Sequence, residues 1–461
     1  MATSEGLQDR FGRNIVFALR VRLADHGGAL AGLLEAIQQA GARVGSVDVV
    51  EGPAGCLDYQ LQVFTTGDEQ MEAARQAAGG VGGAEVLEVM DLALETHRGG
   101  ACEMRSRAAI RSNTDLRIVY TPGVARTCKA IQAEPGKART YTNIANKVAI
   151  ATNGTAILGL GDIGPLAGLP VMEGKAAIFW EFAGISAEPI LIDTHDTDEF
   201  INICAKLAVG FGAIQIEDVK APECFRITRE LDEQLSIPVF HDDQHGTATI
   251  VLAGLYSAMK KTGKQMGDLH CAISGAGAAG TAIADLLAHA GIADVVLCDR
   301  AGVLYRGREQ NMNEEKLALA GRTNKDNIKG TLADAMAGRE LFIGVSRPNL
   351  VTKDMVRGMA ADPIIFALAN PVSEITVAEA YDAGAAVAAD GRMMNNALAY
   401  PGIFRGALDA AAEAITTEML MAAAAALADV VPQGELMPEM MDPATHKAVA
   451  EAVKQAAGRA T

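Results

Sequence analysis

The sequence predicts a multidomain α/β protein, and three observations support that prediction. The chain has 461 residues, about three times the length of a typical domain. Hydrophobic residues make up 49% of it and charged residues 21%, which is a globular composition with ample material for a core. Segments rich in β-forming residues alternate along the chain with segments of helical periodicity. These properties exclude a disordered or fibrous protein.

Residues 13–95 are predicted to form one small domain. In order, the expected elements are a strand at 15–23, a helix through 30–37 closed by Gly41, a hairpin of strands 44–50 and 57–64, a helix at 69–78, and a strand at 86–94. This is the βαββαβ order of the ferredoxin-like arrangement.

A linker and three further parts are expected in the rest of the chain. A polar stretch at 96–101 is typical of a linker. Residues 102–250 form a second α/β domain, and residues 251–425 form a domain that contains a nucleotide-type βαβ unit. Residues 426–461 are rich in alanine, which predicts C-terminal helices.

Charge and cysteine usage narrow the class of protein. The formal net charge of -17 opposes binding to nucleic acid or to an anionic membrane surface. Seven cysteines are scattered without a Cys-x-x-Cys pair, which is typical of reduced intracellular thiols. The first residues show no secretory signal, and no apolar run is long enough for a bilayer. We therefore expect a soluble, cytoplasmic protein.

Two Gly-x-Gly-x-x-Gly motifs occur, and their contexts differ. The first, Gly159, Gly161 and Gly164, is followed by Pro165 and Pro170, which we expect to interrupt any helix that starts there. No acidic residue closes a following strand at the required distance. This motif is therefore not expected to bind a dinucleotide.

The second motif has the context that dinucleotide binding requires. Its glycines are Gly275, Gly277 and Gly280, between a predicted strand at 270–274 and a helix at 278–290. Glycines let the backbone approach a pyrophosphate, and the helix start, with Ala278 and Ala279, supplies N–H donors. A Rossmann dinucleotide-binding unit is predicted here.

The acid that ends the next strand bears on the choice of dinucleotide. Asp299 closes the strand at 294–299, and its carboxylate can accept hydrogen bonds from ribose hydroxyls. This favours NAD, because a 2′-phosphate would meet a negative charge. Arg300 could partly offset that charge, so NADP remains an alternative.

Two further strands end in pairs of acids. Glu217 and Asp218 follow an apolar strand that begins at Ala213, and Asp242 and Asp243 follow a similar strand. Carboxyl ends of neighbouring strands lie where ligands bind, and clustered carboxylates favour Mg²⁺ or Mn²⁺. A solvated turn, or a helix N-cap at Asp243, is the alternative.

The histidines beside the second pair do not form a zinc motif. His241 and His245 lie in His-Asp-Asp-Gln-His, which begins as a strand and is not His-Glu-x-x-His on a helix. A structural role is expected for both histidines. A serine hydrolase is excluded because no Gly-x-Ser-x-Gly elbow occurs.

Lys175 is a candidate general base. It stands at the head of a helix-like apolar run, where burial would lower the pKa of its amine toward a useful value. A helix-start lysine whose amine reaches solvent is the alternative.

The motifs together resemble those of malic enzymes, especially the short bacterial form, over residues 105–425. The matching segments are Val119-Tyr120-Thr-Pro-Gly, Gly159-Leu-Gly-Asp-Ile-Gly164, Val171-Met-Glu-Gly-Lys175, Glu217-Asp218, Phe240-His-Asp-Asp-Gln-His-Gly-Thr247, Phe366-Ala-Leu-Ala-Asn370-Pro and Asn395-Asn396-Ala-Leu-Ala-Tyr-Pro-Gly. The resemblance implies that 102–250 is the substrate and metal domain and that 251–425 is the Rossmann NAD-binding domain.

The resemblance also implies a role for each residue. Tyr120 would be the general acid, Lys175 the general base and Asp242 the partner of the lysine. The metal would be held by Glu217, Asp218 and Asp243. Asn370 would contact substrate and cofactor, and one of Asn395 and Asn396 would contact substrate.

The implied reaction is metal-dependent oxidative decarboxylation of (S)-malate to pyruvate and CO₂, with reduction of NAD. A malolactic-type enzyme, which keeps its cofactor and releases lactate, would carry the same residues. An amino-acid dehydrogenase would not need the metal set, and a catalytically silent sensor would not need Tyr120 and Lys175.

The N-terminal domain resembles an ACT domain, a regulatory module of metabolic enzymes. The family turn Asp-x-x-Gly-x-Leu matches Asp25, Gly28 and Leu30. The resemblance implies a small-molecule effector near these residues, and a helix start without any ligand is the alternative. ACT pairing and the enzyme family both imply a homodimer or a larger homo-oligomer.

Overall fold

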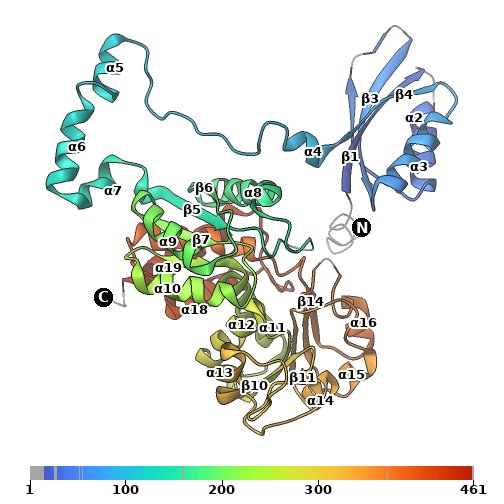
Figure 1. Ribbon diagram of the computed structural model, residues 1–461. Coiled ribbons are helices and arrows are strands. Elements are labelled where there is room, and N and C mark those ends of the chain that lie inside the picture. The colour runs from blue at the N-terminus through green and yellow to red at the C-terminus, as the bar shows by residue number, and fades with distance from the viewer. Residues whose placement is uncertain are drawn as a thin grey trace. The chain divides into compact units, whose positions relative to one another are not determined.

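The computed structural model describes residues 15–24, 28–50, 52–53, 55–157, 160–370 and 372–458. The chain divides into two compact units, Met1–Glu103 and Met104–Thr461, and each is described by itself (Figure 1).

The first unit is a four-stranded antiparallel sheet with two helices, in the predicted βαββαβ order. Its elements are β1 (Ile15–Ala24), α2 (Ala29–Gln39), β2 (Arg43–Val50), β3 (Cys56–Thr65), α3 (Asp68–Gly79), β4 (Ala84–Asp91) and the short α4 (Leu92–Thr96). The sheet order is β2-β3-β1-β4. Alternate residues of β1, such as Leu19 and Val21, are buried with Leu33 and Ile37 of α2, as the half-buried strand pattern requires.

The last strand of this unit is shorter than predicted. The expected strand at 86–94 ends at Asp91, because the Asp91 carboxylate accepts hydrogen bonds from the backbone N–H groups of Ala93 and Leu94. This N-cap starts α4 and ends the extended conformation.

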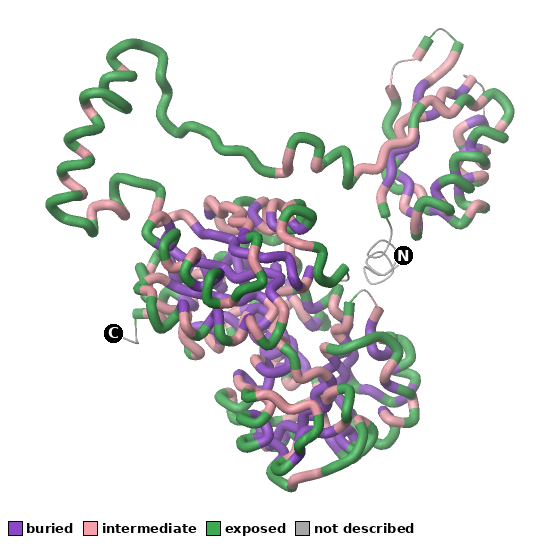
Figure 2. Tube along the Cα trace, in the orientation of Figure 1, coloured by how far each residue is buried: buried purple, intermediate pink, exposed green. Residues whose placement is uncertain are grey.

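The second unit begins with three short helices that form an arm. These are α5 (Asn113–Val119), α6 (Val124–Ala133) and α7 (Ala138–Tyr141), and they contain no buried residue. Figure 2 shows them mostly exposed. We call residues 113–141 the helical arm.

A four-stranded parallel sheet follows, with the order β6-β5-β7-β8. Its elements are β5 (Lys147–Thr152), α8 (Pro165–Ala183), β6 (Ser186–Leu191), α9 (Thr197–Leu207), β7 (Ala213–Ile216), α10 (Glu223–Gln234) and β8 (Val239–His241). Parallel pairing brings the carboxyl ends of β7 and β8 to one edge of the sheet.

The expectation that prolines interrupt a helix after the first glycine motif is wrong. Helix α8 begins at Pro165, where a proline loses no helical hydrogen bond and its fixed φ suits the first turn. Pro170 lies inside the helix and removes one bond near its start. Burial of Met172 and Phe179 on the same helix offsets that loss.

The third part is a six-stranded sheet with the order β11-β10-β9-β12-β13-β14, parallel except for β11. Its elements are α11 (Thr247–Thr262), β9 (His270–Ser274), α12 (Ala278–His289), β10 (Asp294–Asp299), β11 (Gly302–Val303), α13 (Glu314–Arg322), α14 (Leu332–Met336), β12 (Leu341–Gly344), α15 (Lys353–Arg357), β13 (Ile364–Ala367), α16 (Val377–Asp382) and β14 (Val387–Asp390). This is the strand order of a Rossmann sheet.

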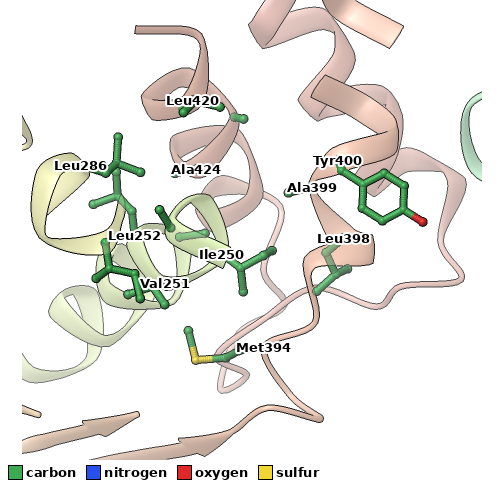
Figure 3. Close-up of a cluster of buried hydrophobic side chains, with 14 of the residues drawn as sticks. Ile250, Val251, Leu252, Leu286, Met394, Leu398, Ala399, Tyr400, Leu420 and Ala424 are labelled. Carbon is green, nitrogen blue, oxygen red and sulfur yellow. The ribbon is translucent and has the colours of Figure 1, made fainter. Parts of the chain in front are cut away.

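Three C-terminal helices complete the unit, namely α17 (Tyr400–Asp409), α18 (Thr417–Asp429) and α19 (Pro443–Ala457). They pack into one apolar cluster that also contains residues of α8, α11 and α12 (Figure 3). The two sheets of this unit therefore share a core. The boundaries expected after residues 250 and 425 fall inside α11 and α18.

Among the residues that the structure describes, no helix is both long and apolar enough to cross a bilayer.

Candidate active site

The two predicted pairs of acids lie at the carboxyl ends of adjacent strands. Glu217 and Asp218 directly follow β7, and Asp242 and Asp243 directly follow β8. Asp218 has a φ of 51°, a left-handed conformation that aspartate tolerates in turns. Its carbonyl accepts a hydrogen bond from the Ala156 N–H, which fixes the turn against the loop after β5.

Lys175 reaches these acids from the middle of α8. Its Nζ lies 2.5 Å from Asp242 Oδ2 and 2.6 Å from Glu217 Oε1. Its side chain is only 13% exposed. The predicted place at the head of the helix is wrong, because α8 starts at Pro165. We call Lys175, Glu217, Asp218, Asp242 and Asp243 the buried charge cluster.

The predicted lowering of the lysine pKa is also wrong. Burial does lower the pKa of Lys175, but the negative charges of Asp242 and Glu217 act in the opposite direction. Together the two carboxylates raise the pKa well above its usual value, because they stabilise the protonated amine at hydrogen-bond distance.

Burial opposes ionisation of the carboxylates in the cluster, whereas the charge of Lys175 favours it. Burial raises the pKa values of Glu217, Asp242 and Asp243, and burial together with the charge of Asp243 raises that of Asp218 to about 7. The buried oxygens Asp218 Oδ2 and Asp242 Oδ1 have no hydrogen-bond partner among the described residues. The cluster contains four acids and one cation, Lys175, so a further cation would reduce the repulsion among its carboxylates.

Metal-binding geometry is not preformed in the part of the chain that the structure describes. No group of three histidine, cysteine, aspartate or glutamate side chains converges there in a way that could hold an ion. The donor chemistry nevertheless suits a hard divalent cation, since the free oxygens belong to buried carboxylates.

Of the two candidate asparagines, the structure brings Asn396 into the cluster. Its Nδ2 donates a 2.6 Å hydrogen bond to Asp242 Oδ2, the same oxygen that Lys175 contacts. Asn395 instead caps its own turn, with Oδ1 accepting from the Ala397 N–H. Asn370 is exposed in the loop after β13.

Sequence reasoning missed Tyr400. This tyrosine is 1% exposed, and Lys175 Nζ lies 4.8 Å from the centre of its ring. Its hydroxyl has no hydrogen-bond partner among the described residues, and burial raises its pKa well above the usual value. Its position four residues after Asn396, in the same sequence motif, was the available signal.

The structure does not bring Tyr120 into the cluster. It directly follows α5 on the helical arm, and 67% of the residue is exposed. The sequence motif therefore predicts a reactive phenol, but the fold of a single chain leaves it in solvent.

The second glycine motif forms the predicted turn between β9 and α12. A side chain at Gly280 would collide with the Gly275 carbonyl, and one at Gly275 would collide with the Val345 carbonyl. A side chain at Gly277 would meet no atom within 4 Å. The turn is therefore tightly packed at Gly275 and Gly280 and open at Gly277. The open position lies at the start of α12, where the backbone N–H groups of Ala278 and Ala279 suit a pyrophosphate.

Asp299 ends β10 as predicted, but its carboxylate is already engaged. Oδ1 accepts from Arg308 Nη2 at 2.5 Å and from the Ala301 N–H at 2.9 Å. Oδ2 accepts from Asn311 Nδ2 and Lys316 Nζ, both at 2.7 Å. The predicted free acceptor for a ribose is therefore occupied by protein donors.

Comparison with known proteins decides the family. Residues 100–232 match the family described as malic enzyme, N-terminal domain, and residues 244–458 match malic enzyme, NAD binding domain. The chain belongs to the malic enzyme family. As such it is a decarboxylating oxidoreductase with an NAD-binding domain, which removes the alternatives of an amino-acid dehydrogenase and a silent sensor.

Individual relatives cover between 78% and 91% of this malic enzyme. It is 44% identical to an NAD-dependent malic enzyme of Geobacillus stearothermophilus, over 91% of this chain and 89% of the relative. It is 46% identical to a bifunctional malic/malolactic enzyme of Bacillus subtilis, over 81% and 93%. The crystal structure of an NAD-dependent malic enzyme from Thermotoga maritima superposes with a TM-score of 0.76 at 42% identity, covering 78% of this chain and 98% of that one.

The N-terminal unit of this malic enzyme contains a cavity of about 290 Å³. Gly28, with a φ of 90°, and Leu30 line it at the start of α2, together with Leu57 and Tyr59 of β3. Asp25 of the predicted effector turn, like Gly159 of the first glycine motif, lies outside the described residues.

Proposed function

We propose that this malic enzyme catalyses metal-dependent oxidative decarboxylation of (S)-malate to pyruvate and CO₂, with reduction of NAD. The observation that carries the proposal is the buried charge cluster, in which one lysine bonds two carboxylates at the edge of a parallel sheet. The relatives named NAD-dependent malic enzyme support the choice of substrate and cofactor.

In the proposed reaction, Lys175 Nζ accepts the proton of the C2 hydroxyl of malate. Asp242 and Asn396 hold the amine in place, because Asp242 Oδ2 bonds Lys175 and Asn396 at once. The raised pKa of Lys175 means that Glu217 and Asp242 must lose part of their negative charge before the amine can act as a base. Asn370 would contact substrate and cofactor from the loop after β13.

Glu217, Asp218 and Asp243 are the residues that would hold Mg²⁺ or Mn²⁺. The unpartnered Asp218 Oδ2 and the raised pKa values of all three acids fit a site that a cation would stabilise. When bound, the metal would stabilise negative charge on the oxygens of the substrate, and NAD would accept the hydride.

The experiment is an assay of the full chain with (S)-malate and NAD⁺, with Mn²⁺ or with a chelator. We expect metal-dependent NADH formation and an equal amount of pyruvate. (R)-Malate serves as the control for the stereochemistry of the site. An absence of malate-dependent NADH and pyruvate with Mn²⁺ present would contradict the proposal.

A malolactic reaction is the second candidate, and the 46% identity to the bifunctional malic/malolactic enzyme favours testing it. The same assay decides, since lactate without net NADH would identify that activity. NADP⁺ in place of NAD⁺ tests the alternative cofactor.

We infer that Tyr120 acts in a homodimer, as the general acid that protonates C3 of the enol after CO₂ leaves. Within one chain it is exposed on the helical arm, together with apolar neighbours such as Ile118 and Val119. An arm with no buried residue cannot be stabilised by its own packing. A second copy of the chain is the partner that would bury the arm. The Tyr120 phenol would then lie in the active site of that second copy.

Helix α8 offers the surface on which that arm would pack. The helix is apolar on its outer side as well as its inner side, with Leu166 77% and Trp180 58% exposed. A helix that is apolar all round is normally covered on all sides. Because α8 also carries Lys175, an arm docked there would bring Tyr120 toward the buried charge cluster of its partner.

We also propose that the N-terminal unit is an ACT domain that binds a small effector, such as an amino acid, in its cavity. The βαββαβ order and the position of Gly28 and Leu30 at the cavity support this proposal. Amino acids added singly to the malate assay should change the rate, and Tyr59→Ala should remove that response without changing the basal rate. A rate indifferent to every amino acid would contradict it.

A further inference from the structure

Glu374 is a buried carboxylate near the carboxyl edge of the six-stranded sheet, and the reaction proposed above does not use it. The residue is 0% exposed. Among the described residues, the partners of its carboxylate are two backbone N–H groups and one serine hydroxyl, and no cation is paired with it. Burial raises the pKa of Glu374, and the two N–H groups act in the opposite direction. These hydrogen bonds therefore offset the cost of burying the charge.

The carboxylate connects two loops that follow neighbouring strands. Oε1 accepts a 2.8 Å hydrogen bond from the Ser346 N–H, in the loop after β12. Oε2 accepts a 3.0 Å bond from the Ala369 N–H, in the loop after β13. Each loop is thus attached to a different oxygen. A glutamine has only one oxygen and could hold only one of the two loops in this way.

The surroundings of Glu374 extend this connection to a third strand. A side chain at Gly344, the last residue of β12, would collide with the Glu374 carboxylate, so the glycine leaves the space that the carboxylate fills. Ser346 Oγ lies 2.8 Å from Oγ of Ser274, which ends β9 immediately before the glycine turn. The loop held by Glu374 is therefore also held to the strand that precedes the pyrophosphate turn.

The position of these loops indicates which half of the cofactor they serve. In a Rossmann sheet the dinucleotide lies across the carboxyl ends of the strands where the strand order reverses, here between β9 and β12. The adenosine half lies on the side of β10, which leaves the nicotinamide half on the side of β12 and β13. Residues 346–349 and Asn370 are exposed at that edge, whereas Glu374 is buried.

We propose that Glu374 is a positioning residue that fixes the loops after β12 and β13 relative to each other, so that both loops can contact the nicotinamide half of the cofactor. Asn370 directly follows Ala369, so the bond to Ala369 also restrains the residue assigned to substrate and cofactor. Glu374 acts through the two loops and not by touching the cofactor. The inference rests on the cofactor site proposed above and adds the residue that orders it.

The test compares the binding of NADH and ADP-ribose to the full chain by calorimetry, without malate. ADP-ribose lacks only the nicotinamide, so the ratio of the two affinities reports on that half of the site. The wild type should bind NADH more tightly. Glu374→Gln should weaken NADH binding about tenfold, the equivalent of one lost hydrogen bond to a charged group, and change ADP-ribose binding less than about twofold.

The matched control is Glu379→Gln. Glu379 also accepts a backbone N–H, that of Thr376, but it is exposed at the start of α16 and touches neither loop. It should leave both affinities unchanged. The melting temperature of Glu374→Gln should stay within a few degrees of the wild type, because a neutral amide costs less to bury than a carboxylate. In the malate assay, kcat/KM for NAD⁺ should fall about 10²-fold, since the nicotinamide would be misplaced.

Three results would overturn the proposal. The first is a Glu374→Gln variant that binds both ligands like the wild type. The second is a variant that weakens both ligands equally and melts at a lower temperature, because Glu374 would then support the fold in general. The third is a wild type that binds NADH no more tightly than ADP-ribose, because the loops would then contact no nicotinamide. The binding measurements need no malate turnover, so a failure of the proposed reaction remains distinguishable from a failure of this inference.

Discussion

In the buried charge cluster, Lys175 lies within 2.6 Å of two carboxylates and is 13% exposed, whereas on the helical arm Tyr120 is 67% exposed. Both residues belong to motifs of the same enzyme family. Lys175 is placed by a parallel sheet and a long helix whose core lies within one chain. Tyr120 is placed by short helices that bury nothing. The difference is what the proposal expects, in which one half of the site is complete in a single chain and the other half is supplied by a second copy.

The largest expected effect concerns the lysine. Lys175→Gln should lower kcat about 10²–10⁴-fold, because the glutamine amide cannot take the hydroxyl proton. Stopped-flow detection of NADH measures the loss. Lys206→Gln, the same change at an exposed lysine of α9, should leave the rate within about twofold. A Lys175→Gln enzyme with wild-type kcat would remove the lysine from the chemistry.

The next effect concerns the arm. Tyr120→Phe should lower kcat about 10²-fold by removing one proton donor and leaving the packing intact. Tyr141→Phe, on the same arm and also exposed, is the matched control and should have no effect on kcat. Equal rates for the two variants would show that the arm carries no reacting group.

Binding of a metal to the buried charge cluster should stabilise the folded protein. Saturating Mn²⁺ should raise the melting temperature by several degrees near pH 8, because the cation binds the folded carboxylates. The increase should shrink as the pH falls through about 7, since Asp218 has its pKa raised to about 7 and a proton then competes with the metal.

Two aspartate variants check the location of that metal. Asp218→Asn should abolish the Mn²⁺-dependent rise in melting temperature, and Asp268→Asn, at an exposed position, should preserve it. If Mn²⁺ raised the melting temperature of the Asp218→Asn variant as much as that of the wild type, the metal would bind away from Asp218.

The smallest effect concerns the apolar outer face of α8. Trp180→Glu should weaken the dimer about tenfold or more, as removal of a central aromatic contact does in other interfaces. Light scattering over a dilution series measures it. Val209→Glu changes another exposed apolar residue away from α8 and should leave the molar mass of the oligomer in solution unchanged. A monomeric wild type at all concentrations would contradict the interface.

The sequence predicted those parts of the fold that depend on neighbours in the chain. Strand β9, the glycine turn, helix α12 and strand β10 have local signals for every boundary, and the structure has them in place. The acids after β7 and β8 were predicted to meet for a general reason, since parallel strands present their carboxyl ends at one edge.

The rest depended on contacts that no local pattern encodes. The pKa of Lys175 is lowered by burial and raised by Asp242 and Glu217, and Asp242 is 67 residues away in the sequence. The donors that occupy Asp299 come from the segment that runs from Ala301 into α13, where no short motif marks them. Tyr400 was hidden in a motif that drew attention to its asparagines. The helix through Pro170 was missed because burial of Phe179 and its neighbours outweighs a weak local preference.

The most direct test of two chains sharing one site is complementation between two inactive variants. Lys175→Gln and Tyr120→Phe enzymes are unfolded together, refolded as a mixture, and assayed with (S)-malate. If each site takes its lysine from one chain and its tyrosine from the other, the mixture should recover about one quarter of the wild-type rate, because half of the dimers are mixed and each mixed dimer has one intact site. If Tyr120 acts on Lys175 of its own chain, no mixed dimer contains an intact site. A mixture no more active than its two components would therefore contradict the account.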